Sequence, residues 1–343
     1  MVAFANRYVA ITREGSTYGT AAGTRKYGEV DSESISHVQE VSYRNDMGYH
    51  AITKSVGGKE YSEGDITLVY QSDDFTGLLL AGFMGHDTES SSNHTMTDGA
   101  ANDPPSFNLE IGREDKEHTY SGCVIDRISV TGSIGEYVML TASFVGRSES
   151  SLTALATPTF DGITKEGMHF HGAEVKFNSD STASDLVKSF SLEMTNNVDT
   201  DNACVLGNRT YVRKPEPTRR EITGSVTFTQ PILMDSVPSS PAQQSEPQYE
   251  DFIAAGGLEV NPDASSANTA IQFKFTDGDS NMAQINIHKV RWEAATLNVS
   301  GRDAAEYTLN FTAMLDKEGS NPSNSLFNIY HEGIASGTAY TAM

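Results

Sequence analysis

The chain has 343 residues, 46 of them acidic and 24 basic, so its formal net charge at pH 7 is −22. A chain this acidic lacks the basic surface that neutralises phosphates, which argues against a protein that wraps nucleic acid. Its most apolar run, residues 78–84, is too short to cross a membrane, and residues 1–15 do not have the pattern of a secretory signal.

Three explanations of the acidity stay open. The carboxylates are consistent with a surface that keeps the protein soluble or with an origin in a salt-rich habitat. They are also consistent with the lining of a passage through which a polyanion moves without adsorbing. The two cysteines, Cys123 and Cys204, are too few for a disulfide scaffold or a zinc site, and we expect both to be reduced.

The first half of the chain is predicted to be mainly β-structure. Residues 42–64 are polar, carry both charge signs and contain many turn formers, which predicts a protruding hairpin arm, here called the first arm. The other elements predicted for this half are strands at 8–12, 30–41 and 63–71, a helix at 74–83, and strands at 107–111, 123–131 and 136–145.

The last two of these strands carry the strongest pattern. Apolar side chains recur at nearly every second position of residues 136–145, which is the period of a pleated strand. Residues 132–135 between them form a short turn with a glycine at each end, as a hairpin requires.

The second half begins after a linker at residues 151–167 that is rich in Ser, Thr, Pro and Gly. We expect a second arm at residues 195–224 and a disorder-prone insertion at 236–247. The remaining predicted elements are a strand at 223–231, a helix at 249–255, a strand at 271–275, two strands within 297–315, and a strand at 326–331 that pairs at a sheet edge or docks on a neighbour.

The two halves share a sequence pattern. Residues 128–132 (ISVTG) align with 297–301 (LNVSG), and Glu136-Tyr137 aligns with Glu306-Tyr307 after one insertion in the turn. Because the order of elements also repeats, we predict a tandem duplication with domains at 1–150 and 168–343. Chance similarity between two β-meanders is the alternative.

No arrangement of residues predicts catalysis. His169 and His171 would lie on one face of a strand, but no acidic or cysteine partner at a ligand spacing supports a metal site. Residues 57–59 lack the spacing of a phosphate loop, and residues 277–280 are better explained as a hairpin turn than as a calcium loop. We therefore predict a protein that is not an enzyme and needs no cofactor.

Basic side chains gather in the two arms. Ordering a long polar arm costs entropy without burying a core, so an arm of this kind suits a protein that assembles. We predict that these charges meet carboxylates on an adjacent subunit and set the register of assembly, with a solvated loop as the alternative. The candidates are Arg44, Lys54 and Lys59 in the first arm and Arg209, Arg213, Lys214, Arg219 and Arg220 in the second.

Several short segments, spread over most of the chain, carry one further pattern. They are residues 8–22, 30–35, 64–68, 78–81, 105–111, 120–124 and 144–146. These segments resemble tail tube proteins of long-tailed, siphovirus-like double-stranded DNA viruses, and the similarity is strongest in the first half.

This resemblance implies two tandem β-sandwich or barrel domains, each with a short α-helix and a long β-hairpin arm. It also implies a structural protein of the virion tail, assembled in the host cytoplasm, whose rings stack into a hollow tube. The genome would pass through the lumen without specific binding, and carboxylates in the lumen would repel it. The partners implied are tail terminator, tape-measure and distal tail proteins, with no membrane.

Family members with one domain per chain form six-fold rings. With two domains per chain, we predict a homotrimeric pseudo-hexameric ring, with a hexamer as the alternative; closing the sheet into a ring removes its free edges. The acidity further suggests a halophilic host. Two other functions stay open: a surface or adhesion β-sandwich that binds a carbohydrate or a protein, and an acidic β-rich hydrolase.

Overall fold

The structure is a computed structural model that describes residues 7–90, 92–98, 103–150, 152–160, 165–177, 183–229, 259–260, 269–279, 281–298, 306–315 and 325–332. In the first half the elements are β1 (Tyr8–Arg13), β2 (Lys26–Gly28), β3 (Ser32–Glu33), β4 (Ser36–Arg44), β5 (Lys54–Val69), α1 (Asp74–Met84), β6 (Asp87–Ser90), β7 (Asn93–Thr97), β8 (Phe107–Arg113), β9 (Lys116–Ser133), β10 (Met139–Gly146) and β11 (Ser148–Glu149). In the second half they are the 3-10 turn η3 (Phe170–Gly172), β12 (Ala173–Phe177), β13 (Val187–Thr195), β14 (Val198–Asp199), β15 (Glu216–Pro217), β16 (Glu221–Phe228), β17 (Glu259–Val260), β18 (Ile271–Thr276), β19 (Met282–Ile287), β20 (Val290–Asn298), β21 (Glu306–Ala313) and β22 (Phe327–Glu332). The chain is mainly β-structure, as predicted.

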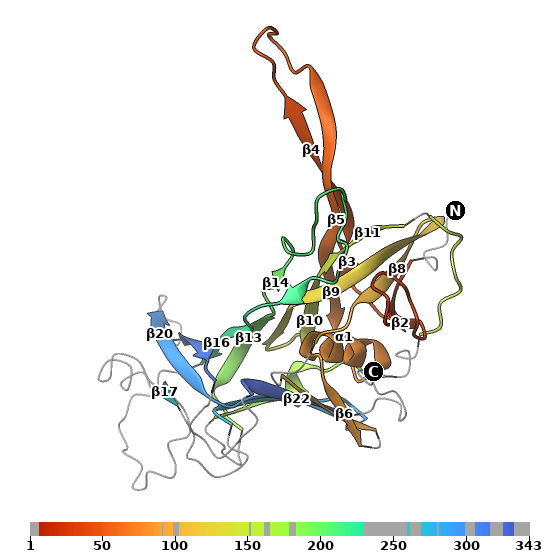
Figure 1. The fold of residues 1–343 in the computed structure, drawn as a ribbon. Helices are drawn as coiled ribbons and strands as arrows, with labels where there is room; N and C mark the ends of the chain where they lie inside the picture. The colour runs from red at the N-terminus through yellow and green to blue at the C-terminus, as the bar shows by residue number, and fades with distance from the viewer. Residues whose placement is uncertain are drawn as a thin grey trace, which may run out of the picture.

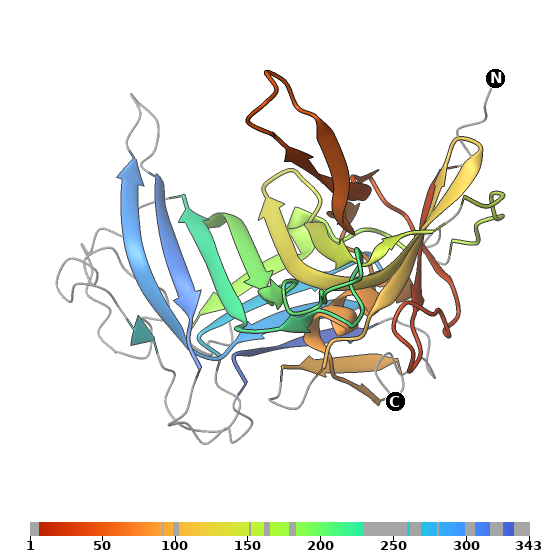
Figure 2. The ribbon, with the colours of Figure 1, turned by 45° about the horizontal axis from the view of Figure 1, so that its top comes forward.

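One large antiparallel sheet runs through both halves (Figures 1 and 2). Its strand order is β17-β20-β21-β16-β13-β9-β10-β5-β3, and β4 also pairs with β5. The halves meet where β13 pairs with β9, with Leu192 opposite Val130. The linker at 151–167 therefore does not separate the halves into independent sheets.

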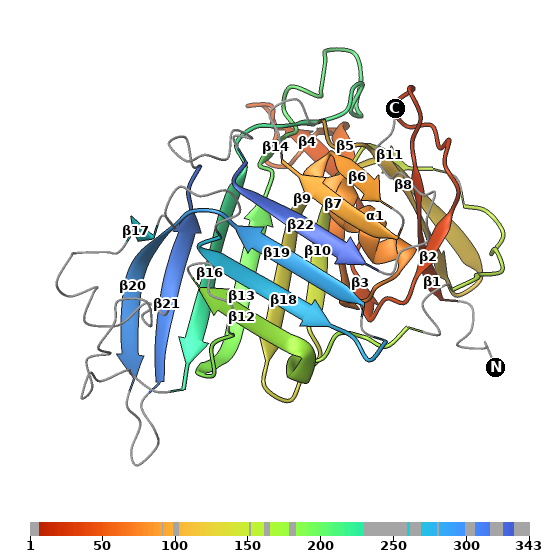
Figure 3. The same ribbon diagram turned by 90° about the horizontal axis from the view of Figure 1, so that it is seen from below.

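A second layer covers one face of this main sheet. Under the second half it is a sheet with the order β12-β18-β19-β22-β7-β6, which includes two strands from the first half (Figure 3). Under the first half, β1 pairs with β8, and β8 pairs with the beginning of β9. β9 passes from this layer into the main sheet, and Gly122 along it has a φ of 66°, a conformation that favours glycine.

The strand pattern explains which face of the main sheet is covered. In β10, Leu140, Ala142 and Phe144 are buried while the residues between them are partly exposed. β16 and β21 alternate in the same way. One face of the main sheet therefore packs on the second layer, and the other, here called the open face, is in contact with solvent.

Helix α1 fills the space between the layers of the first half, and all of its residues are buried. The side chain of Asp73 caps its first turn by accepting a hydrogen bond from the Thr76 N–H at 2.8 Å. Gly85 ends the helix in the left-handed conformation, with a φ of 84°. The predicted helix at 74–83 is thus confirmed, whereas the predicted helix at 249–255 and the insertion at 236–247 lie outside the described residues.

The two halves use the same strand pairing in the main sheet. The series β9-β10-β5-β3 in the first half has the counterpart β20-β21-β16-β13 in the second. In both, a glycine lies opposite a phenylalanine: Gly64 opposite Phe144 and Gly224 opposite Phe311. The β9–β10 ladder shifts register next to Phe144, and the β20–β21 ladder shifts next to Phe311.

This register corrects part of the sequence alignment. With Gly64 superposed on Gly224, Leu140 rather than Tyr137 matches Tyr307, since Leu140 lies opposite Leu68 and Tyr307 opposite Phe228. Tyr137 lies outside β10 and is 51% exposed, whereas Tyr307 is fully buried. The slip is three residues, an odd number that exchanges the two faces of the strand, because the sequence alignment followed the identical Glu-Tyr pair and not the alternation of apolar residues.

Two further predictions need correction. β22 is an interior strand between β19 and β7, not an edge strand. The second arm is not a long hairpin, because its only described ladder is the two-residue pairing of β14 with β15, and the rest lies against the first half. The cause is a set of contacts between this arm and residues of the first half that are far apart from it in sequence.

Candidate functional site

The first arm projects from the body as a two-stranded hairpin formed by β4 and the beginning of β5 (Figure 1). Arg44 pairs with Lys54 at the last step of the ladder, and residues 45–53 form the turn. The arm carries exposed apolar side chains as well as the polar ones expected from the sequence. These are Val41, Tyr43, Met47, Tyr49, Ile52 and Val56.

The basic residues of the first arm have different surroundings. Arg44 donates to Asp46 of the same turn at 2.8 Å, and Lys54 is exposed. Lys59 lies 3.7 Å from Asp201 and 5.2 Å from the ring centre of Tyr211. Lys59 is thus held by the second arm of its own chain.

The second arm packs against the base of the first. The Glu60 N–H donates to the Arg209 carbonyl at 2.8 Å, and the Arg209 guanidinium lies 2.6 Å from the Glu60 carboxylate. Tyr211 is buried and stacks on Tyr61 with 6.3 Å between ring centres. Arg209 therefore contacts a carboxylate of its own chain, where the sequence had suggested one from a neighbour.

Two other basic residues of the second arm anchor it to the first half. Arg220 donates to the Asn196 side chain at 2.8 Å and to the Phe83 carbonyl at 3.0 Å, at the end of α1. Burial lowers the pKa of Arg220 from its usual value. Lys214 donates to the Pro104 carbonyl at 2.8 Å. Arg219 is exposed and lies 3.2 Å from Glu221, and Arg213 is exposed.

The open face of the main sheet is lined mostly by hydroxyl groups. They belong to Thr67, Ser129, Thr131, Thr141, Ser143, Ser189, Ser191, Thr195, Thr223, Ser225, Thr227, Thr308 and Thr312. Thr67 and Thr141 bond across strands at 3.0 Å, and Thr227 and Thr308, at the matching positions of the second half, bond at 2.9 Å. Sequence reasoning missed this surface, although the Ser and Thr residues alternate with the apolar ones.

Charged groups are fewer on this face and mostly acidic. The carboxylates are Glu63, Asp65, Glu193, Glu221, Glu293 and Glu306, and the cations are Arg127, Arg291 and Lys188, the last of which pairs with Glu306. Arg127 and Glu193 lie 3.9 Å apart across the β9–β13 junction. The face is therefore polar with an excess of negative charge, but hydroxyls rather than carboxylates dominate it.

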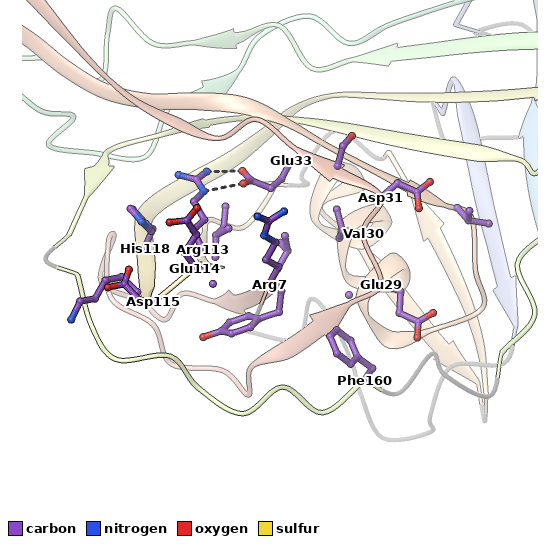
Figure 4. A pocket seen from close by; sticks show the side chains of 18 of the residues that line it. Arg7, Glu29, Val30, Asp31, Glu33, Arg113, Glu114, Asp115, His118 and Phe160 are labelled. Carbon is purple, nitrogen blue, oxygen red and sulfur yellow. Dashed lines mark hydrogen bonds and ion pairs between the residues drawn. The ribbon is translucent and has the colours of Figure 1, made fainter. Parts of the chain in front are cut away.

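A cavity of about 1100 Å³ lies beside β3, between β1, β2 and β8 (Figure 4). Charges of both signs line it, and Arg113 forms two hydrogen bonds with Glu33 at its edge. Its described lining residues do not include a nucleophile next to a base. The cavity offers no catalytic arrangement.

A buried polar cluster lies near this cavity. Tyr8 donates to Glu117 at 2.6 Å, Arg25 donates to the same carboxylate at 2.8 Å, and Thr12 donates to Glu110 at 3.0 Å. Burial raises the pKa of Glu110 to about 7, against the opposing charge of Arg25. These groups stabilise one another and connect β1, β8 and β9.

The residues for which the sequence analysis rejected a metal site lie in turns. His171 belongs to the 3-10 turn η3 and His169 directly precedes it, so they do not lie on one face of a strand; their Nδ1 atoms are 2.8 Å apart. Asp277 closes a hairpin turn by accepting from the Asn281 N–H at 2.8 Å. Within the described part of the chain, no group of three or more His, Cys, Asp or Glu residues could hold a metal ion, and no helix could span a membrane.

The two outer edges of the main sheet are its least covered backbone. At one end lie β3 and β4, whose described ladders are those with β5. At the other end lies β20, where β17 covers only Val290 and Arg291 in the described ladder. An uncovered strand edge is a template for pairing with another chain.

In the part of the chain that the structure describes, the projecting hairpin, the polar open face and the incompletely paired sheet edges are features of a structural protein that assembles. A family model, described as phage tail tube protein, matches residues 5–231. The chain belongs to this family. No curated protein matches it. This tail tube protein is therefore a structural component of a virion tail, in a family whose members stack into a tube, and an adhesion module is not favoured.

Proposed function

We propose that this tail tube protein forms closed rings that stack into the hollow tail tube, and that the viral genome passes through the tube into the host. The observation that carries the proposal is the junction between its own halves, where β13 and β9 pair edge to edge over seven residue pairs, from Ser189–Ser133 to Thr195–Arg127. Family membership supports the same function.

The halves are proposed to be tandem copies of one domain, with boundaries near 1–150 and 168–343. The matched strand series, the Gly–Phe cross-strand pairs, the register shifts beside Phe144 and Phe311, and the two threonine pairs support this. A β-bulge is conserved within families because it redirects a strand. Two meanders that were similar only by chance would not need bulges at matching positions.

The internal junction suggests how chains meet. In it, β13, which is the neighbour of β16 in the sheet, pairs with β9, which is the neighbour of β10. At the two ends of the sheet, β3 and β4 take the position equivalent to β13, because they pair with β5, and β20 takes the position equivalent to β9, because it pairs with β21. Pairing β3–β4 of one chain with β20 of the next repeats the internal junction, and such a head-to-tail contact closes into a ring.

Three chains would then supply six domains. A homotrimeric pseudo-hexamer is the ring expected if each domain replaces one subunit of a six-fold ring, and a hexamer of whole chains is the alternative. Closure would leave no free edge in the inner sheet.

The open face would line the lumen. Its hydroxyls offer no fixed positive charge to phosphate, and its excess of carboxylates repels DNA, so the genome can move without adsorbing. Tail terminator, tape-measure and distal tail proteins would meet the ends and interior of the tube, and assembly would take place in the host cytoplasm. No catalysis or cofactor is needed for this function. The net charge of −22 also suits a halophilic host.

Native mass spectrometry and electron microscopy test the proposal. Rings of three times 37.1 kDa, with pseudo-six-fold end views and hollow stacks at high salt, are expected. Rings of six chains would replace the trimer by the hexamer and retain the tube. Monomers at every salt concentration, combined with stabilisation by a glycan, would overturn the proposal in favour of a binding module.

A further inference from the structure

We infer that neighbouring chains of one ring are joined by a second seam, in the second layer, where the edge of β11 and the cavity beside β3 receive part of the next chain. The β11 edge is defined as residues 148–150 and 152–153. The occupant is the part of the next chain between its β16 and β18. This inference rests on the proposed ring, which pairs chains in the main sheet, and adds a contact in the layer behind that sheet.

The two halves of one chain are joined in both layers. In the main sheet, β9 pairs with β13. In the second layer, β7 of the first half pairs with β22 of the second over five residue pairs, among them Met96 with Ile329, and both of these side chains are fully buried. The junction inside the chain therefore has two seams, and the pairing of β3–β4 with β20 between chains repeats only the first.

β11 takes the place in the first half that β22 takes in the second. β22 follows β21 in the chain and pairs with β19, which leads into β20. β11 follows β10 and pairs with the beginning of β9, which leads into the main-sheet part of the same strand. The strands beside them also agree, because β12-β18-β19 and β1-β8-β9 are both antiparallel series. The edge of β11 that faces away from β9 is thus equivalent to the edge of β22 that β7 covers.

In the described part of the chain, no strand covers that edge of β11, whose ladder is with β9. The contact with β9 continues beyond β11. The Ser150 N–H donates to the Thr119 carbonyl at 2.7 Å, and Glu117 and Thr153 exchange two backbone hydrogen bonds of 3.1 Å. Leu152, within this stretch, is 51% exposed. A strand that is paired along one side and open along the other is a template for a strand of another chain.

The cavity beside β3 adjoins the β11 edge, since Leu152 and both residues of β3 line it. In the second half, the corresponding space between the layers is filled from the first half: Tyr70 is fully buried, with its ring centre 5.6 Å from that of Phe275 in β18. In the first half, β8 is the counterpart of β18, and its Ile111 faces the cavity of about 1100 Å³. A second chain would supply here the side chains that Tyr70 supplies within the chain.

One neighbour can reach both the β11 edge and the cavity. The cavity connects the β11 edge to β3, which the proposed ring pairs with β20 of the next chain. In the first half, β6 and β7 lie between β5 and β8, so their counterpart in the second half lies between β16 and β18. β17, the described strand of this part, pairs with β20 and so lies at the edge that meets the neighbour. The occupant is therefore this part of a second copy of the chain.

Hydrogen exchange of rings and of unassembled chains tests the seam. The amides of residues 148–153 are expected to exchange at least tenfold more slowly in rings, together with those of β3, β4 and β20. The amides of β22, which is paired along both edges within the chain, are the matched control and should exchange equally in both states. Slowing at β3, β4 and β20 without slowing at residues 148–153 would overturn the inference and leave the proposed ring intact.

Photo-cross-linking identifies the occupant in a C204S background, in which the remaining thiol, Cys123, is buried. L152C labelled with benzophenone-maleimide and irradiated in unstacked rings should give covalent dimers whose second peptide comes from residues 229–270. I134C is the matched control, because Ile134 is 56% exposed and its N–H donates to a carbonyl of β13 at 3.3 Å, at the junction inside the chain. It should give no dimers. Dimers through the first half of the neighbour, or cross-links confined to one chain, would overturn the inference, since they would place another segment on the β11 edge.

A charge on the β11 edge should weaken the ring without unfolding the chain. L152D should raise at least tenfold the concentration at which half of the chains are in rings, measured by native mass spectrometry, whereas I134D should leave it unchanged. Thermal unfolding of unassembled protein should change little in both, because both side chains are exposed. L152D rings as stable as those of the wild type would overturn the second seam alone. A wild-type protein that forms no rings would overturn the proposed function together with it.

Discussion

The two arms occupy matching places in the two halves, between β4 and β5 and between β13 and β16, yet they have opposite properties. The first arm extends into solvent and exposes apolar side chains, whereas the second lies on the first half and buries Ala203 and Tyr211. The sequence had marked basic residues of both arms for contact between subunits, three in the first arm and five in the second. The comparison shows that charge in a loop does not identify the loop that stays free.

The largest contrast is expected from removing each arm. Replacing residues 200–215 by an Asn-Gly turn between β14 and β15 should lower the free energy of unfolding by at least about 3 kcal/mol, because it uncovers Tyr61 and deletes buried Tyr211. Replacing residues 45–53 by the same turn between Arg44 and Lys54 should change it by less than about 0.5 kcal/mol. Urea unfolding of the unassembled protein measures both, and equal losses would contradict the comparison.

Substituting one tyrosine in each arm tests the same difference in stability between the arms without altering the backbone. Tyr211 is 1% exposed and Tyr49 is 70% exposed. Y211A should cost about 3 kcal/mol, because it removes a buried ring and leaves a cavity, while Y49A should lie within about 0.5 kcal/mol of the wild type. Chemical denaturation checks the pair, and a stable Y211A protein would show that the second arm is not held by this ring.

Arginines of the second arm give a smaller contrast. R220A should cost about 2 kcal/mol, since it removes the guanidinium that donates to the Asn196 side-chain oxygen and leaves the Phe83 carbonyl with the Asn196 amide as its donor. R219A should cost less than about 0.5 kcal/mol, because Arg219 is exposed and forms only a surface pair with Glu221. Thermal unfolding of the two variants side by side tests whether Arg220 acts as an anchor; similar melting temperatures would reject that role.

The pH dependence of stability lies outside both arms and serves as their control. The pKa of Glu110 is raised from 4.5 to about 7 in the folded protein, so its contribution to stability is complete below pH 4.5 and is lost as pH rises to about 7. The slope from one such group is at most about 1.4 kcal/mol per pH unit. E110Q should reduce the decline of stability over this window, measured by urea unfolding at several pH values, and should leave arm-dependent assembly unchanged. An identical decline in E110Q would assign the pH dependence to other groups.

Patterns local in sequence predicted much of the fold. The alternation of apolar and polar residues predicted β8, β9 and β10. The acidic residues before an apolar run predicted α1, whose first turn is capped by Asp73. These features were predictable because strand alternation and helix capping depend on neighbours within a few residues.

Features of the candidate site that depend on distant residues were not predictable in the same way. Arg209 meets Glu60 across 149 positions of sequence, and Arg220 meets Phe83 across 137. The slip between Tyr137 and Tyr307 arose because the sequence alignment followed an identical Glu-Tyr pair, whereas the pairing across the ladder matches Leu140 to Tyr307.

By itself, the sequence determined that this tail tube protein is an acidic, mainly β chain with a short helix that begins at Asp74. The tertiary structure decided which arm stays free, which face of the main sheet carries hydroxyl groups into solvent, and which strand edges are left uncovered. The physical reason is that local propensity specifies elements, whereas the burial and pairing that free or cover a surface are set by contacts between segments far apart in the chain.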